Sequence, residues 1–391
     1  MTITVRVMSA ELSATVTGAA NHGTIRRLHR PEGRYASKLG DSMFPASHHG
    51  GWHSRPICRF RALMDLGRVQ GISTTTAVAI VGALSSSRVP DIWTIAGLWL
   101  ISVFAHSGGA AVNELWQRKG AALAPASKDS KGAADSGVIP PRTAGILAVA
   151  AIMTALGLSL AIFGPAAFLA ILISCIWLVY FGAFGSRTVT AFDLAFAIGY
   201  PVYGLFGCLA SGMPTLWIGV FMATVAGVAL FSRWDHGRED LDTDRRFGVP
   251  SFAVVWGLSM RLGVRAKDPY YTVGLALKCV FMAVVALPLM YMKLPFTYFL
   301  MVFGIGYPAQ VYVMWRFLKK QNRFEYLKTI LIDVPLSWVL GSAIVIPVAG
   351  MLAYFAMKIF VVAGYLLGTA LRSDAGTQFL RHAATAAAAR A

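Results

Sequence analysis

One short stretch near the middle of the chain has the residue types that bind a cation. Residues 238–248 read REDLDTDRRFG and place four carboxylates among six consecutive positions, in a chain that is only 14% charged. Asp235 lies just upstream. On a helix, Asp240 and Asp244 share one face, and Asp235 and Glu239 share a neighbouring face, because residues four apart point the same way. Like charges at this spacing repel, which favours a positive partner.

Two interpretations of this acidic stretch are open. In the first it binds Mg2+, a hard cation that proteins hold with one or two carboxylates together with phosphate oxygens. In the second it is a solvated helix end, neutralised by its own arginines. Those arginines are Arg238, Arg245 and Arg246. The sequence around the stretch is needed to choose between the two.

The composition is that of a membrane protein. Hydrophobic residues make up 56% of the chain and the mean hydropathy is +0.60. Apolar runs of about 18 or more residues recur, and a helix of that length spans a bilayer. They cover approximately 71–88, 93–112, 143–163, 165–183, 190–210, 214–231, 271–291, 295–315 and 336–366. We therefore predict an all-α multi-pass bundle of about nine transmembrane helices, the last of which tilts or kinks at Pro347.

The loops between these runs predict an orientation. If the N-terminus is cytoplasmic, so are the loops at 113–142, 184–189, 232–270 and 316–335, which hold most of the loop Lys and Arg. The opposite loops hold only Arg88 and Lys293. This asymmetry follows the positive-inside rule and places the acidic stretch on the cytoplasmic side, or on the matrix or stromal side of an organelle. It also accounts for most of the +17 net charge without a nucleic-acid partner.

The chain divides into three predicted segments. Residues 1–65 form a polar, basic tail that we expect to be disordered, 66–366 form the transmembrane domain, and 367–391 form a C-terminal tail. The N-terminal tail lacks the apolar core of a secretory signal, but its arginines leave an organellar transit peptide open. Within the spans, Lys278 and Lys358 are expected to extend their ammonium groups toward the membrane surface.

Two polar helix ends, called mouths below, are predicted on one side of the membrane. The second apolar run ends at Asn113 and Glu114, and the sixth run ends just before the acidic stretch. Each mouth is followed by a loop rich in Arg and Lys. Two facing clusters of acidic or amide groups, each flanked by cations, suit a diphosphate bridged by a metal ion. This favours the magnesium interpretation.

With these residues in place, the sequence resembles the UbiA family of intramembrane prenyltransferases over approximately residues 66–366. Members have nine transmembrane helices and two Asp-rich motifs on cytoplasmic loops. The second motif, DxxxD followed by xxxG, resembles residues 240–248, and the loop 136–144 is similar to the SGxIxxxxA segment that follows the first motif. Arg187 stands where the family places a basic residue after a tyrosine, here Tyr180.

The first motif departs from the family pattern. The family's NDxxDxxxD reads here as Asn113, Glu114, Gln117 and Ala121. Asn113 is kept and Glu114 is a conservative change, whereas Gln117 and Ala121 replace two metal-binding aspartates. A glutamine offers a carbonyl oxygen to a cation but no charge, so we expect weaker metal binding or a different geometry on this side. The departure also puts ordinary aromatic prenylation in question, though not diphosphate binding.

The resemblance implies an enzyme that uses Mg2+ and ionises a prenyl diphosphate at the cytoplasmic mouth, with the prenyl tail among the helices. Asp240, Asp244 and Asn113 would be catalytic. The implied metal-binding set is Asp240, Asp244, Asp235, Glu239, Asn113, Glu114 and Gln117. Basic side chains would bind the phosphates, and aromatic faces would stabilise the allylic cation. These are Arg187, Lys131 and Arg238 for the phosphates, and Tyr180, Tyr200, Tyr203 and Trp234 for the cation.

Three functions remain open at this point. The prenyl group is transferred to an aromatic or lipid acceptor, or the prenyl chain closes on itself as in the terpene cyclases related to this family, which the altered first motif permits. Alternatively the protein is a non-catalytic transporter or binding relative. A transporter is expected to have inverted repeats and broken helices at the bilayer midplane, whereas the polar residues here gather at one face. A requirement for an acceptor discriminates between transfer and cyclisation.

Overall fold

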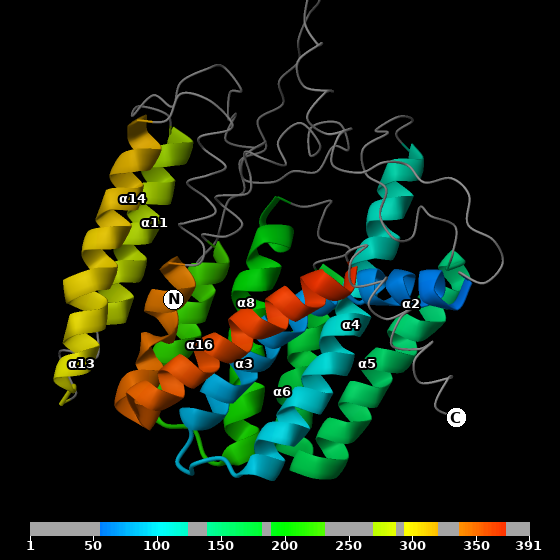
Figure 1. Ribbon diagram of the computed structural model, residues 1–391, viewed down its shortest axis with the longest axis horizontal. Coiled ribbons are helices and arrows are strands. Elements are labelled where there is room, and N and C mark those ends of the chain that lie inside the picture. Colours follow the sequence, from blue (N-terminus) through cyan, green and yellow to red (C-terminus); the bar gives the residue numbers. More distant parts are fainter. Residues whose placement is uncertain are drawn as a thin grey trace, which may run out of the picture. The chain divides into compact units, whose positions relative to one another are not determined.

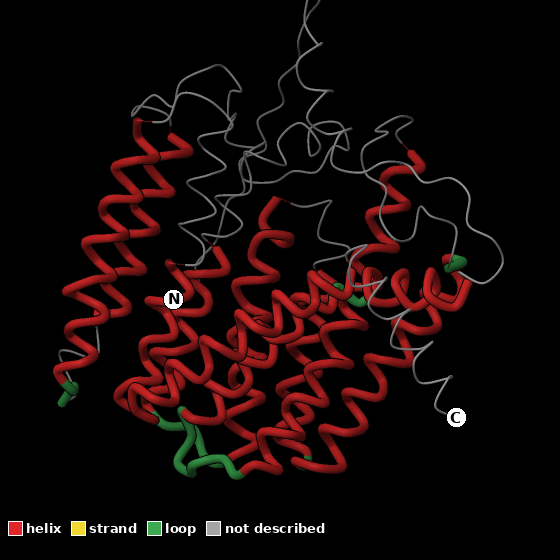
Figure 2. The backbone as a smooth tube through the Cα atoms, in the orientation of Figure 1, coloured by secondary structure: helices red, strands yellow, loops and turns green. Residues whose placement is uncertain are grey.

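The structure, a computed structural model, describes residues 55–123, 139–181, 189–230, 269–286, 293–319 and 336–372. At several helix ends only the backbone is described, which includes Gln117 and Tyr180. The secondary structure of this part of the chain is helical and contains no strand (Figure 2). The predicted all-α fold is therefore confirmed.

The helices follow the apolar runs of the sequence (Figure 1). The first half contains α2 (Arg55–Leu66), the 3₁₀ turn η2 (Val69–Gly71), α3 (Ile72–Leu84), α4 (Ile92–Leu123), α5 (Pro141–Phe163), α6 (Pro165–Cys175), the π-helical turn η3 (Ile176–Phe181) and α8 (Val189–Ser211). The second half contains the helix Leu216–Leu230, α11 (Pro269–Ala286), α13 (Phe296–Phe299), the π-helical turn η5 (Leu300–Gly306), α14 (Tyr307–Lys319), a helical segment at 336–341, the 3₁₀ turn η6 (Ser342–Ile344) and α16 (Val345–Arg372). Each of the nine predicted spans contains a helix within the described ranges.

Four of these helical segments are long and apolar enough to cross a membrane. They are Ile92–Leu115, Pro141–Phe163, Phe296–Arg316 and Leu336–Ala370, and five further apolar helices have 10–17 residues. Side chains on the outside of α5, such as Ile146, Val149 and Met153, are more than 60% exposed. In water such a surface would be costly, whereas lipid chains solvate it. The fold is that of an integral membrane protein.

The turn between α5 and α6 is a tight hairpin at Gly164 and Pro165. Gly164 has φ 82°, a backbone conformation that residues with a Cβ rarely adopt. Pro165 begins α6 at its first position, where a missing backbone N–H costs no helical hydrogen bond. The two helices pack against each other along the hairpin.

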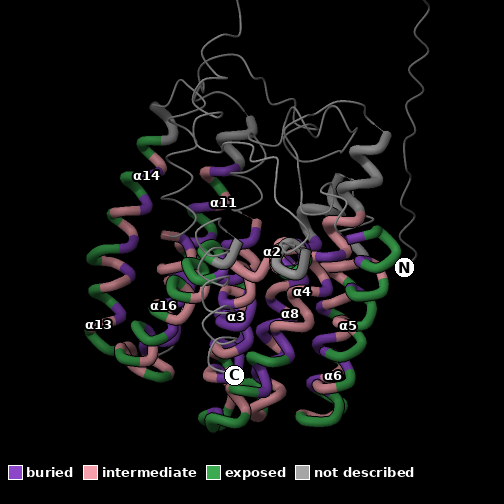
Figure 3. Tube along the Cα trace, turned by 45° about the vertical axis from the view of Figure 1, so that its right-hand side comes forward, coloured by how far each residue is buried: buried purple, intermediate pink, exposed green. Residues whose placement is uncertain are grey.

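Helix α3 lies at the centre of the packing and positions the site described below. It contacts α8, α4 and α16, and Figure 3 shows it largely buried, whereas α5 has many exposed positions. The Ser73 hydroxyl donates a hydrogen bond to the Val361 carbonyl of α16 over 3.1 Å. Because α3 is enclosed by three other helices, its polar side chains meet protein rather than lipid.

Helix α2 lies at the end of the segment 1–65 predicted as a disordered tail and extends one residue beyond it. Its backbone is helical from Arg55 to Leu66. Ala62 and Leu66, one turn apart, are only 5% and 4% exposed. The apolar stripe that they form packs against Ile139, Ala144 and neighbouring residues in a small core cluster, which favours a helix in a segment with polar composition.

The last span departs from helical geometry at Gly350 rather than at Pro347. Gly350 has φ 87°, whereas Pro347 lies in the first turn of α16, directly after η6 in the sequence, where a proline is tolerated. Beyond the break, the chain approaches the segment that precedes it. The Lys358 ammonium donates to the Trp338 carbonyl over 3.1 Å and to the Ser342 hydroxyl. The partly buried Lys358 side chain is therefore bonded to the protein on the other side of the break. Lys278 is also buried, at 4% exposure.

Candidate active site

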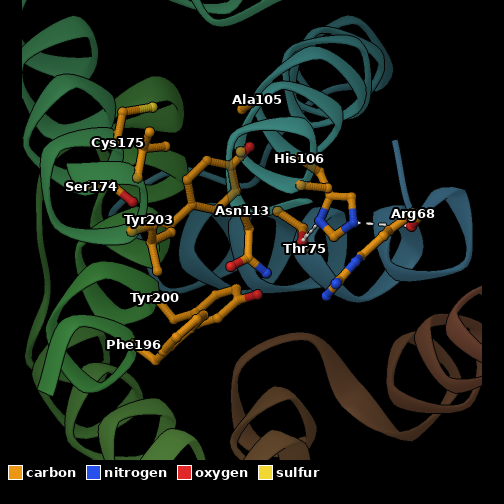
Figure 4. A pocket seen from close by; sticks show the side chains of 14 residues that line it. Arg68, Thr75, Ala105, His106, Asn113, Ser174, Cys175, Phe196, Tyr200 and Tyr203 are labelled. Carbon is orange, nitrogen blue, oxygen red and sulfur yellow. Dashed lines mark hydrogen bonds between the residues drawn. The ribbon is translucent and has the colours of Figure 1, made fainter. Parts of the chain in front are cut away.

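A cavity of about 150 Å3 lies between α3, α4, α6 and α8 (Figure 4). Its walls come from the residue before η2, the N-terminal part of α3, the middle of α4, the end of α6 with η3, and α8. One side is polar and the other is apolar and aromatic. The lining side chains used below are Arg68, Thr75, His106, Asn113, Phe196, Tyr200 and Tyr203.

Glycines set the distance between α3 and α8, which carry two of the walls. A Cβ at Gly82 would lie 1.9 Å from the Gly204 carbonyl oxygen, and a Cβ at Gly207 would lie 1.9 Å from the Ala79 carbonyl oxygen. Helices approach this closely only where side chains are absent. A buried hydroxyl ties α8 to α6, because Ser174 donates to the Gly199 carbonyl over 2.8 Å.

Arg68 and His106 form the polar side of the cavity. Arg68 adopts a left-handed backbone conformation with φ 44°, uncommon for a residue other than glycine. Its guanidinium lies 3.8 Å from the Glu114 carboxylate, and the two side chains are 41% and 15% exposed. The Arg68 carbonyl meets the Nε2 atom of His106 at 3.1 Å, while the Nδ1 atom of that imidazole lies 2.8 Å from the Thr75 hydroxyl.

Aromatic rings of α8 form the opposite wall. Phe196 and Tyr200, one turn apart, are stacked with ring centroids 6.1 Å apart. Tyr203 is only 2% exposed, and its hydroxyl shares a 2.8 Å hydrogen bond with the buried Ser102 hydroxyl of α4. This bond fixes the ring of Tyr203 between α4 and α8. The cavity thus places π faces opposite a cationic and amide-bearing side.

The structure brings Asn113 to this cavity, where its amide lies among the side chains of α3 and α8 (Figure 4). Its neighbour Glu114 is mostly buried and faces Arg68. Gln117 continues the same helix, and Tyr180 belongs to η3, but only their backbones are described. The other predicted site residues lie outside the described part of the chain: Asp235, Arg238, Glu239, Asp240, Asp244, Arg187, Lys131 and Trp234.

Comparisons with known proteins give the family. A model of the UbiA prenyltransferase family matches residues 73–332. The chain belongs to this family. The matched range covers most of the chain and includes Asn113 and residues 231–268 that carry the acidic stretch. The predicted resemblance is therefore confirmed. A comparison with curated proteins found no match.

Solved structures show the same fold. A digeranylgeranylglyceryl phosphate synthase in membranes aligns with TM-score 0.59 and 17% identity, over 75% of this chain and 99% of that one. A UbiA homologue from Aeropyrum pernix K1 aligns with TM-score 0.56 and 16% identity, over 71% and 98%. A UbiA homologue from Archaeoglobus fulgidus bound to GPP and Mg2+ aligns with TM-score 0.53 and 15% identity, over 73% and 99%.

The described side chains suit a hard cation in part. Asn113 and Glu114 bring an amide oxygen and a carboxylate to the cavity region, and oxygen donors are what Mg2+ prefers. Within the described ranges, no group of three His, Cys, Asp or Glu lies close enough to hold a metal. The acidic stretch 235–244, from which further carboxylate ligands are predicted, lies outside the described residues.

Sequence reasoning did not identify Arg68, Thr75 or His106 as members of the site. For His106 a signal was available, since it precedes Asn113 by seven residues and so lies on the same face of α4. Arg68 is the basic residue that immediately precedes the first span. Thr75 gave no signal, because a threonine in an apolar helix is ordinary and its orientation depends on how α3 packs. Tyr200 and Tyr203, expected to face the prenyl cation, do line the cavity.

Proposed function

We propose that this UbiA-family protein is a Mg2+-dependent intramembrane prenyltransferase, which ionises a prenyl diphosphate and transfers the prenyl group to an aromatic or lipid acceptor. The observation that carries the proposal is the cavity itself. It has the Asn113 amide and the Arg68 guanidinium on one side and the rings of Phe196, Tyr200 and Tyr203 on the other. A substrate with an anionic head and an apolar tail matches such a division.

The head of the substrate would meet the polar side. Arg68 lines the cavity with five N–H donors in a planar fork, which suits phosphate oxygens. We further propose Arg187, Lys131 and Arg238 as phosphate ligands, and Asp240, Asp244, Asp235, Glu239, Asn113, Glu114 and Gln117 as the metal-binding set. Bound Mg2+ would neutralise charge on the departing diphosphate. The solved homologue that holds both GPP and Mg2+ supports this pairing of ligands.

The aromatic wall would stabilise the carbocation. Loss of diphosphate leaves an allylic cation, and a π face within about 6 Å stabilises a cation by roughly 0.5–2 kcal/mol. Tyr200 and Tyr203 come from consecutive turns of α8, and the Ser102 hydrogen bond holds the second of them. Because their rings are packed in place before the substrate arrives, they need no rearrangement during ionisation. Tyr180 is a further candidate for this wall.

Cyclisation of the prenyl chain is the second candidate, and one observation favours it. Gln117 and Ala121 replace two acidic positions of the first family motif, so the metal site differs from the pattern expected for transfer to an aromatic ring. The same cavity would serve, with the prenyl chain folding against the π faces of α8. The two functions differ in whether an acceptor is consumed.

Product analysis tests the proposal. Membranes containing the protein are given prenyl diphosphates of several lengths with Mg2+, with and without aromatic and lipid-alcohol acceptors, and products are identified by mass spectrometry. We expect a prenylated acceptor only when acceptor and Mg2+ are both present, and none when a chelator is added. A cyclic hydrocarbon or alcohol formed without acceptor would assign cyclisation instead. No Mg2+-dependent product under any of these conditions would refute both.

A further inference from the structure

The hydrogen bonds of His106 determine where the protons lie on this side of the cavity. The Nε2 atom faces the Arg68 carbonyl at 3.1 Å, and a carbonyl oxygen only accepts hydrogen bonds. In the neutral imidazole, Nε2 must therefore carry the proton, and Nδ1 is left with a lone pair. The Thr75 hydroxyl, 2.8 Å from Nδ1, then donates its proton to the ring.

The imidazole is held in this orientation by its surroundings. A Cβ at Gly71 would lie 2.6 Å from the His106 ring, so the ring reaches the Arg68 carbonyl only because residue 71 is a glycine. One nitrogen is bound to the backbone before α3, and the other is bound to α3 itself. Rotation of the ring would break both bonds.

Thr75 consequently presents an oxygen with free lone pairs toward the cavity that it lines. Its hydrogen is directed at His106, so this oxygen can only accept from any other group. A hydroxyl oxygen has two lone pairs, which are available to a bound molecule.

We propose that Thr75 and His106 form the proton acceptor of the reaction catalysed in this cavity, an inference that rests on the proposed function above. Every version of that reaction releases a proton. With a hydroxyl acceptor, the bond from carbon to the diphosphate breaks and its electron pair leaves on the diphosphate. The acceptor oxygen forms the new bond to the allylic carbon. Its proton passes to the Thr75 oxygen as the Thr75 proton passes to Nδ1 of His106.

The same pair serves the other possible products. From an aromatic ring or a cyclised chain, the proton leaves a carbon next to the cation, and the C–H electron pair forms the π bond. In each case an imidazolium results, whose Nε2–H remains on the Arg68 carbonyl. Among the charged groups near the ring, the Arg68 guanidinium disfavours the positive charge of the imidazolium, whereas the negative charges of Glu114 and of a bound diphosphate favour it. The neutral Tyr200, Tyr203 and Cys175 complete the surroundings.

A first experiment measures the protonation pattern without any reaction. The protein, labelled with ¹⁵N-histidine, is studied by NMR in lipid nanodiscs, and the signal of His106 among the eight histidines is assigned with His106→Gln. We expect the tautomer protonated at Nε2. Thr75→Val should shift the Nδ1 resonance, whereas Thr224→Val should not, because the buried Thr224 hydroxyl bonds only to Val220 of its own helix in the described structure. A tautomer protonated at Nδ1 would overturn the proposal.

A second experiment measures turnover of geranyl diphosphate with Mg2+ and the acceptor found by product analysis. Thr75→Val and His106→Ala should each lose about 10²-fold or more of product formation, as expected for loss of general base catalysis. Binding of geranyl diphosphate, measured by thermal shift, should change less than about two-fold. Added imidazole should restore activity to His106→Ala but not to Thr75→Val, which a purely structural role would not produce.

The outcomes separate the two proposals. Full turnover in His106→Ala, or a loss that imidazole leaves unchanged, would overturn the role of the pair while prenyl transfer stands. A wild-type protein that binds none of the prenyl diphosphates supplied would instead refute the proposed function, and the NMR result would still report on the hydrogen bonds. Thr224→Val serves as the control in both experiments, since it removes the same hydroxyl at a buried position away from the cavity.

Discussion

Replacement of Gly207 by alanine tests whether the close contact between α3 and α8 holds the walls of the cavity in place. The added Cβ would lie 1.9 Å from the Ala79 carbonyl oxygen, about 1.5 Å short of ordinary van der Waals contact. Ala79 is completely buried, and the atom that is met belongs to the backbone, so no side chain can rotate away. The two helices must therefore separate.

The expected cost is at the upper end of the range for overpacking, about 3 kcal/mol, which corresponds to a fall in Tm of roughly 6 °C for a domain of this size. Separation of the helices also moves Thr75 on α3 away from Tyr200 on α8. We therefore expect turnover to fall together with stability in Gly207→Ala.

The measurement is thermal unfolding in detergent, followed by circular dichroism, with Gly157→Ala as the matched control. Gly157 lies on α5, and a Cβ there meets nothing within 4 Å. Its replacement should leave Tm unchanged or raise it slightly, because alanine favours a helix by about 1 kcal/mol relative to glycine. If Gly207→Ala unfolds at the same temperature as Gly157→Ala, the close crossing of α3 and α8 is not what holds the cavity.

Three further predictions concern stability and metal affinity. Asp91 immediately precedes α4 and accepts a 2.7 Å hydrogen bond from the Thr94 backbone N–H, which together with the Thr94 hydroxyl lowers the pKa of its exposed carboxyl. The stability that this hydrogen bond contributes is present above the pKa that Asp91 has in the unfolded chain, and it is lost as the pH falls through the lowered pKa of the folded protein. The difference in Tm between wild type and Asp91→Ala should therefore shrink on acidification; a constant difference would contradict this. Gln117→Asp should raise the affinity for Mg2+, measured by the metal concentration for half-maximal turnover, because it adds a carboxylate to the first motif; an unchanged value would place Gln117 outside the metal site. Ser174→Ala removes the 2.8 Å hydrogen bond to the Gly199 carbonyl and should destabilise the protein by about 1 kcal/mol in chemical unfolding, and no change would show that this bond does not tie α6 to α8.

The spans and their order could be predicted because they depend on local composition. Twenty apolar residues in a row must form a helix in a bilayer, since every backbone polar group needs a partner. The hairpin at Gly164 and Pro165 is local in the same sense, as a glycine and a proline fit the end of one helix and the start of the next. For these features the residues act on their immediate neighbours in the chain.

The cavity could be predicted only in part, because it depends on how helices face one another. Gly82 and Gly207 are two of 38 glycines, and nothing in their own surroundings in the sequence distinguishes them as contact points. The hydrogen bond from Lys358 to the Trp338 carbonyl could not be predicted, because the two residues lie twenty positions apart, on either side of the break at Gly350. Asn113 was found since a motif marks it, whereas Thr75 depends on the rotation of α3.

The central claim is that an acidic stretch, acting with Asn113, holds Mg2+ and so promotes loss of diphosphate from a prenyl substrate. Its most direct test is the rate of Mg2+-dependent diphosphate release from geranyl diphosphate by the purified protein, with Asp240→Ala and Asp244→Ala compared with Asp242→Ala. We predict that the first two variants release no diphosphate above background although they unfold at the wild-type temperature, and that Asp242→Ala retains the wild-type rate. Wild-type release by either Asp240→Ala or Asp244→Ala would contradict the claim.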